Sequence, residues 1–381
     1  GLNPTSSAFA VSAYVMGNAV FDTLTALAAD GSAVPNLAAS LTPSDDLKDW
    51  TLVLRPDILF HDGTPLNSAA VKANFDAAYA APLVGLAVRP FYPTENAVEI
   101  VDDLTLIYHL LDPNLQFPHA LRSQLGMVAS PAWIDAAVAD PTLNQQPVGT
   151  GPFKFDSWVT DAYVSLVKNP DYHVAGLPKL AGLKFNIVPE SSTRQAGMAS
   201  GAYQFFPSVD AVTINALARI PDVVTTKVPD LGYSLVGMNV SKPPFDNPKV
   251  REALNYALNR HEIVRGVYMG RASIAAPLPA VLSEWAVPYA EFPCYQSNPE
   301  RAKALLQEAG VSMPLAITLN VLPNPVAKDT AEIVQAQLDK GGFKVTLLSQ
   351  EIGKFVADWR ASNFTAFVSL NGGGVDPDDY F

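Results

Sequence analysis

The sequence contains a single cysteine, Cys294, in 381 residues. An internal disulfide needs two cysteines, so none can form. The expected role of Cys294 is packing, and cysteine usage says nothing about the redox environment of the protein.

Runs of basic residues and long apolar runs are also lacking. The chain carries 25 Lys and Arg against 37 Asp and Glu, a net charge of −12, which argues against nucleic acid or an anionic membrane surface as a partner. No stretch has the length of apolar sequence that spans a bilayer, and none has the form of a signal peptide. Composition alone allows the cytoplasm or the exterior.

Catalytic motifs are missing as well. There is no Gly-x-Ser-x-Gly elbow, no His-Glu-x-x-His and no Walker loop, so we predict no catalytic residue and no cofactor. Gly149-Thr150-Gly151-Pro152 resembles a phosphate loop, but Pro152 removes an amide donor and a tight turn before a strand at 153–155 is favoured. A hydrolase using cleft carboxylates remains an alternative, although no nucleophile–base pair is visible.

Metal ligands are not paired in the sequence. The five histidines lack the spacing that places two imidazoles on one ion, and we predict no metal site. Asp376, Asp378 and Asp379 lack the glycine and distal glutamate of an EF-hand, so turn formation and helix capping explain them better.

What the sequence does contain is an alternation of strand and helix patterns. A length of 381 residues with 49% hydrophobic composition predicts at least two lobes. The α/β pattern predicts a helix at 68–79 capped by Asn67, and a final strand at 364–370 that is apolar on both faces and therefore central. The other expected elements are strands at 51–55, 104–110, 164–167, 183–188, 317–321 and 343–348, and a helix at 330–338 that joins the last two in parallel.

The segment from Asn239 to Gly270 predicts two capped helices. Asn247 caps the first, Pro248 occupies its first turn, and apolar residues fall on one face. Asn259 caps the second with Glu262 in the capping-box position. We expect its buried side to hold Ile263, Val264 and Val267.

The same segment closely resembles one in the extracytoplasmic solute-binding proteins of ABC importers, family 5, which include oligopeptide, dipeptide, glutathione and nickel binders. Further segments resemble the family in the same order along the chain. They are Phe21-Asp22-Thr23-Leu24, Val34-Pro35-Asn36-Leu37-Ala38, Trp50 to Arg55, Phe60 to Pro65, Gly149 to Phe153, Ile187 to Arg194 and Asn298 to Gly310.

The resemblance implies a two-lobed periplasmic-binding-protein-like α/β fold of type II with an extra subdomain. Residues 1–45 and 150–235 would form the core of lobe I, residues 46–149 its appended subdomain, and residues 240–381 an incomplete lobe II. Because family members continue beyond the Asp376-Pro377-Asp378 motif, we expect the C-terminal part of the fold to be missing.

The function implied is that of a substrate-binding component. It would capture a small solute, first a peptide or peptide-like compound, and deliver it to an ABC permease outside the cytoplasm, in the periplasm or as an anchored lipoprotein. A nickel chelate, glycoside or siderophore-like solute is the alternative ligand, with His119 a weak candidate for nickel. Sensing or chaperoning is an alternative role, and we expect a monomer at full length.

The resemblance also implies the ligand-binding residues. Tyr14, Met16 and Asn18 correspond to a loop that lines the cleft, although alternation equally explains Tyr14 and Met16 as buried. Arg122 is the only cation between residues 118 and 131 and could clamp a carboxylate or be an ordinary surface arginine. Two further stretches complete the expected site: Met238 with Asn239 at a presumed hinge, and Leu370, Asn371, Gly372 and Gly373.

The last stretch departs from the peptide-binding pattern. In dipeptide and oligopeptide binders it carries a tryptophan and an aspartate that grips the α-ammonium, and here those positions fall at Leu370 and Gly373. A buried ammonium needs a charge partner. The glycines therefore suit a bulkier or less cationic solute, or a flexible loop.

Overall fold

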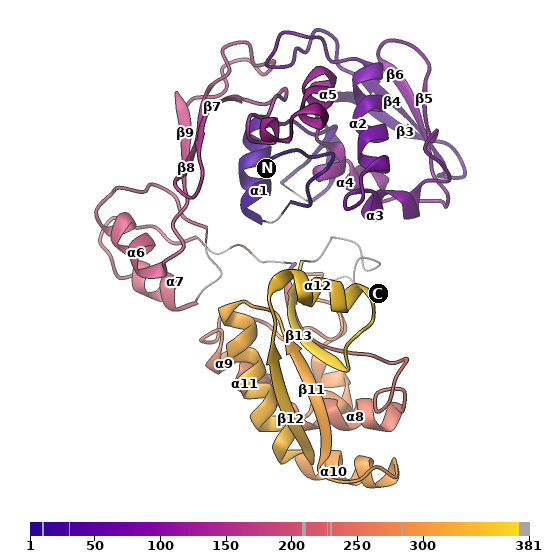
Figure 1. Ribbon diagram of the computed structural model, residues 1–381, viewed down its shortest axis with the longest axis vertical. Helices are drawn as coiled ribbons and strands as arrows, with labels where there is room; N and C mark the ends of the chain where they lie inside the picture. The colour runs from indigo at the N-terminus through magenta and orange to yellow at the C-terminus, as the bar shows by residue number, and fades with distance from the viewer. Residues whose placement is uncertain are drawn as a thin grey trace. The chain divides into compact units, whose positions relative to one another are not determined.

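The computed structural model describes residues 1–9, 11–29, 31–207, 211–226, 228, 231–282 and 285–372. Contacts divide the chain into two compact units, residues 1–189 and residues 190–381. In Figure 1 the first unit is coloured from indigo to magenta and the second from there to yellow, by residue number. The division into a lobe I core, an appended subdomain and lobe II stays a prediction.

An antiparallel sheet and the helix packed along it form the larger core of the first unit. The strand order is β3 (Ala38–Pro43), β4 (Asp49–Leu54), β6 (Thr105–His109) and β5 (Val98–Ile100). Helix α2 (Ser68–Ala80) begins at Asn67, whose Oδ1 accepts the Ala70 amide proton at 2.9 Å. Figure 1 shows α2 beside this sheet. The predicted helix and both predicted strands are confirmed.

A second antiparallel sheet of the first unit carries a smaller core. It consists of β7 (Phe153–Val159), β8 (Tyr163–Lys168) and β9 (Gly182–Asn186). A Cβ on Gly149 or Gly151 would lie 2.3 Å or 2.6 Å from backbone atoms of Val20. Gly149 and Gly151 are therefore required by a close approach to the backbone of Val20, and residues 150–152 bend into β7.

Shorter elements complete the first unit. They are α1 (Val11–Val20), β1 (Thr25–Leu27), β2 (Ala33–Pro35), α3 (Gly85–Val88), α4 (Phe117–Ala120) and α5 (Pro131–Ala139).

A mixed sheet organises the second unit, in the order β10 (Tyr233–Met238), β13 (Ala366–Asn371), β11 (Leu315–Val321) and β12 (Phe343–Ser349). Strands β11 and β12 are parallel and joined by α11 (Pro325–Lys340). Strand β13 lies between β10 and β11. The predicted parallel unit and the central position of the last strand are both confirmed.

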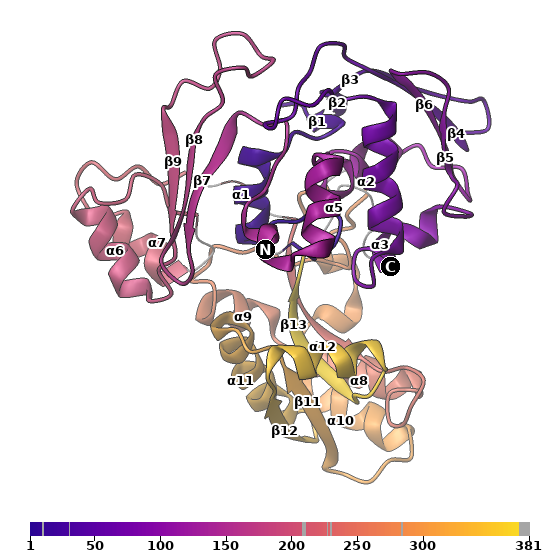
Figure 2. The ribbon, with the colours of Figure 1, turned by 45° about the horizontal axis from the view of Figure 1, so that its top comes forward.

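Helices cover both faces of this sheet, and Figure 2 shows them around β11, β12 and β13. Buried residues of α8 (Pro248–Ala257), α10 (Pro299–Glu308) and α11 pack on the face that carries Ala366 and Val368. On the opposite face, Phe355 of α12 (Ile352–Arg360) meets Phe367 edge-on at 6.0 Å. The unit also contains α6 (Ser191–Ala199), α7 (Ala211–Leu217) and α9 (Arg260–Gly266).

The capping predictions for this unit hold with one correction. The side chains of Asn247 and Asn259 cap α8 and α9 as expected. However, the backbone amide of Asn259 donates to Gln337 Oε1 at 2.9 Å, and the Glu262 carboxylate accepts from Gln337 Nε2 at 3.0 Å. A tertiary contact thus replaces the reciprocal half of the capping box. The expected buried side of α9 is only half-buried.

Candidate ligand-binding site

Helix α1 carries the first group of predicted site residues. The expected loop is wrong, because Val11–Val20 is helical. Tyr14 and Asn18 are four residues apart and share a helical face, with Tyr14 half-buried and Asn18 exposed. Met16 is half-buried and, like Tyr14, packs against the smaller core of the first unit. Helical period rather than strand alternation therefore decides which of these side chains reach the surface.

Phe9 packs on the same helix. Its ring meets the Tyr14 ring edge-on, with 5.7 Å between centroids, and a Cβ on Gly17 would lie 2.8 Å from it. Gly17 thus leaves the space that the Phe9 ring needs. Sequence reasoning missed Phe9; the available signal was an aromatic residue preceding a helix that contains a glycine.

The tight turn after α4 brings Arg122 to Tyr14. Burial raises the pKa of Tyr14, and a hydrogen bond with the Gln124 backbone and the positive charge of Arg122 act in the opposite direction. The Arg122 Nε donates to His119 Nδ1 at 3.4 Å. Two stretches that the resemblance assigns to the ligand site, Tyr14 and Arg122, are therefore neighbours in the first unit.

Arg122 has no carboxylate partner among the described residues, since none of the ion pairs found there includes it. Its side chain is half-buried. A half-buried guanidinium usually pairs with a carboxylate or phosphate, because its planar fork of donors matches those groups. Arg122 can therefore hold an anionic group of a ligand.

The second unit separates its predicted site residues. In the β10–β13 ladder Leu370 lies opposite Ser234, whereas Met238 lies opposite Ala366. Four residues of extended strand span about 13 Å. Leu370 and Met238 both pack against the core made by α8, α10 and α11, so the structure places them at opposite ends of one buried face.

Both the nitrogen and the oxygen of the Asn239 side-chain amide form hydrogen bonds within the protein. Its Nδ2 donates to the carbonyls of Ser362 and Phe364, each at 3.0 Å, and its Oδ1 accepts from the Ser241 amide and hydroxyl. The residue is 6% exposed. These contacts tie the residue that follows β10 to the segment that precedes β13. They leave no donor of this side-chain amide for a ligand.

Asn371 and Gly372 lie at the other end of the ladder. Asn371 is exposed and lies opposite Tyr233, and no described residue beyond its chain neighbours would lie within 4 Å of a Cβ added to Gly372. Asn320, near the carboxyl end of β11, pairs with Phe367 and so lies nearer the Met238 end; it donates to Gln350 Oε1 at 3.1 Å. The carboxyl ends of parallel strands are the common place for ligands in α/β sheets. Sequence reasoning missed Tyr233 and Asn320, although an asparagine near the end of an apolar strand is a usable signal.

Several predicted positions lie outside the described residues: Gly373, Asp376, Asp378 and Asp379.

A buried carboxylic acid, Asp22, follows α1 in the chain. Asp22 is 8% exposed and accepts hydrogen bonds from the Tyr172 hydroxyl at 3.0 Å and the Thr150 hydroxyl at 3.5 Å. Burial raises the pKa of Asp22 to about 7, against the effect of these two bonds. His173 Nδ1 is buried 3.6 Å from the carboxylate without a hydrogen bond. This cluster was also missed, because its members are distant in sequence.

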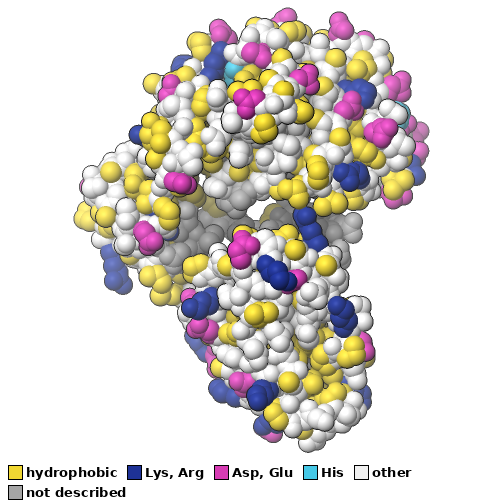
Figure 3. Space-filling model, in the orientation of Figure 1, with side chains coloured by type: hydrophobic (Ala, Val, Ile, Leu, Met, Phe, Trp, Pro, Cys, Tyr) yellow, Lys and Arg dark blue, Asp and Glu magenta, His cyan; other side chains and the backbone are white. Residues whose placement is uncertain are grey.

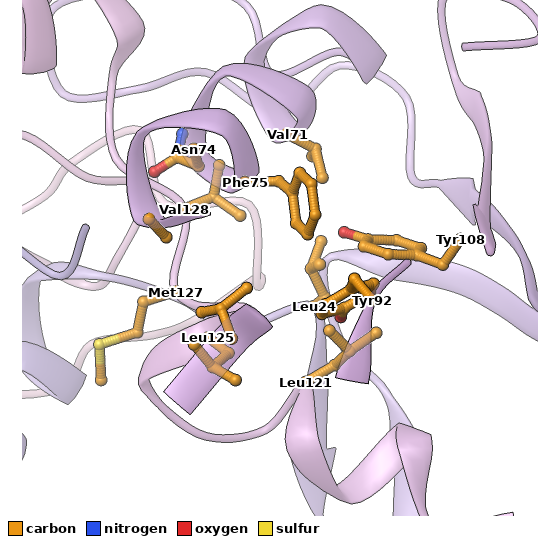
Figure 4. Close-up of a pocket in the computed structure, with 12 residues that line it drawn as sticks. Leu24, Val71, Asn74, Phe75, Tyr92, Tyr108, Leu121, Leu125, Met127 and Val128 are labelled. Atoms are coloured by element: carbon orange, nitrogen blue, oxygen red, sulfur yellow. The ribbon is translucent and has the colours of Figure 1, made fainter. Parts of the chain in front are cut away.

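The cavity shown in Figure 4 is too small for a solute. It has a volume of about 20 Å³ and is lined by core residues such as Phe75, Tyr92 and Tyr108, which is room for about one water molecule. Within the described part of the chain no three His, Cys, Asp or Glu residues are grouped to hold a metal ion. On the face shown in Figure 3, Lys and Arg side chains are spread singly among acidic and apolar ones.

Comparison with known proteins decides the family. The family model of the bacterial extracellular solute-binding proteins, family 5, matches residues 32–381. The chain belongs to this family. The glutathione-binding protein GsiB of Pectobacterium atrosepticum is 33% identical over 324 residues, 84% of this chain and 62% of that protein.

Two solved structures agree with this chain in fold. A dipeptide-binding protein from Pseudoalteromonas in complex with Met-Leu matches with a TM-score of 0.85 and 23% identity, over 100% of this chain and 80% of that one. HbpA2 from Haemophilus parasuis matches with a TM-score of 0.77 and 29% identity, over 100% and 79%. These matches confirm the predicted two-lobed α/β class.

The chain spans about 62% of the length of the curated relatives that it matches. Among the residues that the structure describes, no helix is both long and apolar enough to cross a membrane.

Proposed function

We propose that the protein is the substrate-binding component of an ABC importer and captures a small peptide-like solute that bears a carboxylate. It would work outside the cytoplasm, as a monomer at full length, and deliver the solute to the permease without catalysis. Membership of the family supports the role. The carboxylate preference rests on one observation, the half-buried Arg122 beside Tyr14 without a described carboxylate partner.

The remaining ligand contacts are proposed from the same family pattern. Tyr14, Met16 and Asn18 would form the wall on the first unit. Asn371 and Gly372 would face the solute at the end of β13, and Gly373 is proposed with them from the family pattern alone. Because Leu370 and Met238 pack against the core, their contribution would be to shape the backbone.

The absence of an acidic side chain at Leu370, Asn371 and Gly372 bears on the solute's charge. A free α-ammonium taken out of water without a carboxylate partner costs several kcal/mol. The relative that binds glutathione makes an acidic, peptide-like compound the first candidate. A metal chelate with carboxylate arms is the second, because Arg122 would serve its arms equally well.

Calorimetric titration of the full-length protein tests this function. Wild-type protein, Arg122→Ala and Arg301→Ala are compared with glutathione, an acidic dipeptide and the C-terminal amide of that dipeptide. The Arg301 side chain is 41% exposed and paired with Glu308, so its replacement removes the same charge elsewhere. A charged hydrogen bond contributes about 1.5–3 kcal/mol, so Arg122→Ala should weaken the carboxylate ligands roughly 10- to 100-fold.

The control variant should bind like the wild type, and the amide should be the least affected by Arg122→Ala. Equal affinity of wild type and Arg122→Ala for all carboxylate ligands would remove Arg122 from the site. Absence of heat with every ligand, chelates included, would contradict the binding role itself.

A further inference from the structure

One side chain, Gln124, ties together the segment that leads into α1. Its Nε2 donates to the carbonyl oxygens of Pro4 at 2.7 Å and Ser7 at 2.6 Å. Its Oε1 accepts the amide proton of Phe9 at 3.1 Å. A primary amide has two donor hydrogens and one acceptor oxygen, so Gln124 uses both hydrogens and its oxygen on three separate backbone groups.

The backbone of the same residue reaches Tyr14. The Gln124 backbone acts to lower the pKa of the Tyr14 phenol. Phe9, whose backbone amide Gln124 holds, packs its ring edge-on against the Tyr14 ring. Gln124 therefore holds Tyr14 in place through Phe9.

Arg122 stands on the same turn. It lies two residues before Gln124, in the tight segment that leads from α4 into the 3-10 turn at Gln124–Gly126. At Gly126 an added Cβ would lie 1.6 Å from the carbonyl oxygen of Leu121, so this backbone is closely folded on itself. Displacement of Gln124 would move the backbone that carries Arg122 as well.

We infer that Gln124 is a positioning residue for the ligand wall formed by Tyr14 and Arg122, an inference that rests on the proposed function for its binding consequence. The side chain of Gln124 makes its hydrogen bonds to three backbone groups. It acts by holding the phenol of Tyr14 and the guanidinium of Arg122 in fixed relation, so that the two groups meet a carboxylate-bearing solute together.

Hydrogen exchange on the full-length protein tests the positioning without any ligand. Gln124→Met keeps the length of the side chain and removes its hydrogen bonds, whereas Gln146→Met is the control because Gln146 is exposed. Amide exchange in peptides covering residues 9–20 should accelerate at least tenfold in Gln124→Met and remain unchanged in the control. Equal exchange in both variants would overturn the inference.

A second variant separates the hydrogen bonds from general disruption. In Gln124→Glu the ionised carboxylate still accepts from Phe9 but has no proton for Pro4 and Ser7, and protonation restores one donor. Protection of residues 9–20, relative to the wild type at the same pH, should be lost at pH 7 and partly recovered at pH 4. An identical loss at both values would refute the hydrogen-bond mechanism.

Binding then tests the functional consequence. Titration with glutathione, the probe used above, should show a loss of affinity of at least fivefold in Gln124→Met and none in Gln146→Met. Faster exchange with unchanged affinity would refute the role at the ligand site. If wild-type protein binds no probe, the proposed function fails, while the exchange data still decide whether Gln124 holds Tyr14 in place.

Discussion

Replacement of Asp22 by asparagine should change how the stability of the protein depends on pH. The carboxyl group is buried against Tyr172, Thr150 and His173. Asparagine has the same shape, accepts the Tyr172 hydrogen bond through its oxygen, and offers an N–H toward the unbonded Nδ1 of His173. The variant therefore resembles the protonated form of the wild-type side chain.

The magnitude follows from the pKa of Asp22. Burial raises it from 3.8 to about 7 in the folded protein, so the folded state holds a proton that the unfolded state has released between these values. The resulting stabilisation is complete below about pH 4 and is lost as the pH rises through 7. Between pH 5 and pH 8 the wild type should lose about 3 kcal/mol from this group.

Urea unfolding of wild type and Asp22→Asn at pH 5 and pH 8 measures this effect, because titration of the groups that do not interact with Asp22 cancels in the difference between the two proteins. The variant should gain about 3 kcal/mol of relative stability at pH 8 over pH 5. Asp135→Asn, at an exposed position of α5, should show no such gain. Parallel pH profiles for wild type and Asp22→Asn would refute the reasoning.

Two further substitutions test a pair of hydrogen bonds and a packing contact in the second unit. Asn239→Ala should lower the free energy of unfolding by at least about 2 kcal/mol, because it leaves the carbonyls of Ser362 and Phe364 without their donor; unchanged stability in chemical denaturation would argue that water replaces the amide. Gly237→Ala should cost about 1–3 kcal/mol, because its Cβ would lie 2.3 Å from the ring of Phe367. An unaltered melting temperature would show that the ring moves aside freely.

Elements with local signals were predictable. Asn67 and Asn247 cap helices in the structure as their sequence contexts indicate, because a capping side chain bonds amides two or three residues away. The central position of β13 was equally readable, since a strand that is apolar on both faces must be covered on both.

Features that depend on distant partners were not predictable. The backbone amide of Asn259 donates to Gln337 Oε1 rather than to Glu262. No local pattern reveals this partner. The same limit applies to Gln124, whose three backbone partners lie more than a hundred residues away. A lone glutamine between Ser123 and Leu125 has no periodicity that would mark it.

The sequence by itself determined the family, the α/β class and the absence of recognisable catalytic motifs, because these follow from short segments that keep their spacing. Tertiary structure alone decided which predicted site residues meet. It brings Tyr14 beside Arg122, and it places Leu370 and Met238 at opposite ends of one ladder. The physical reason is that strand register and the folding of a turn onto a helix are set by contacts between distant segments, which spacing along a chain does not encode.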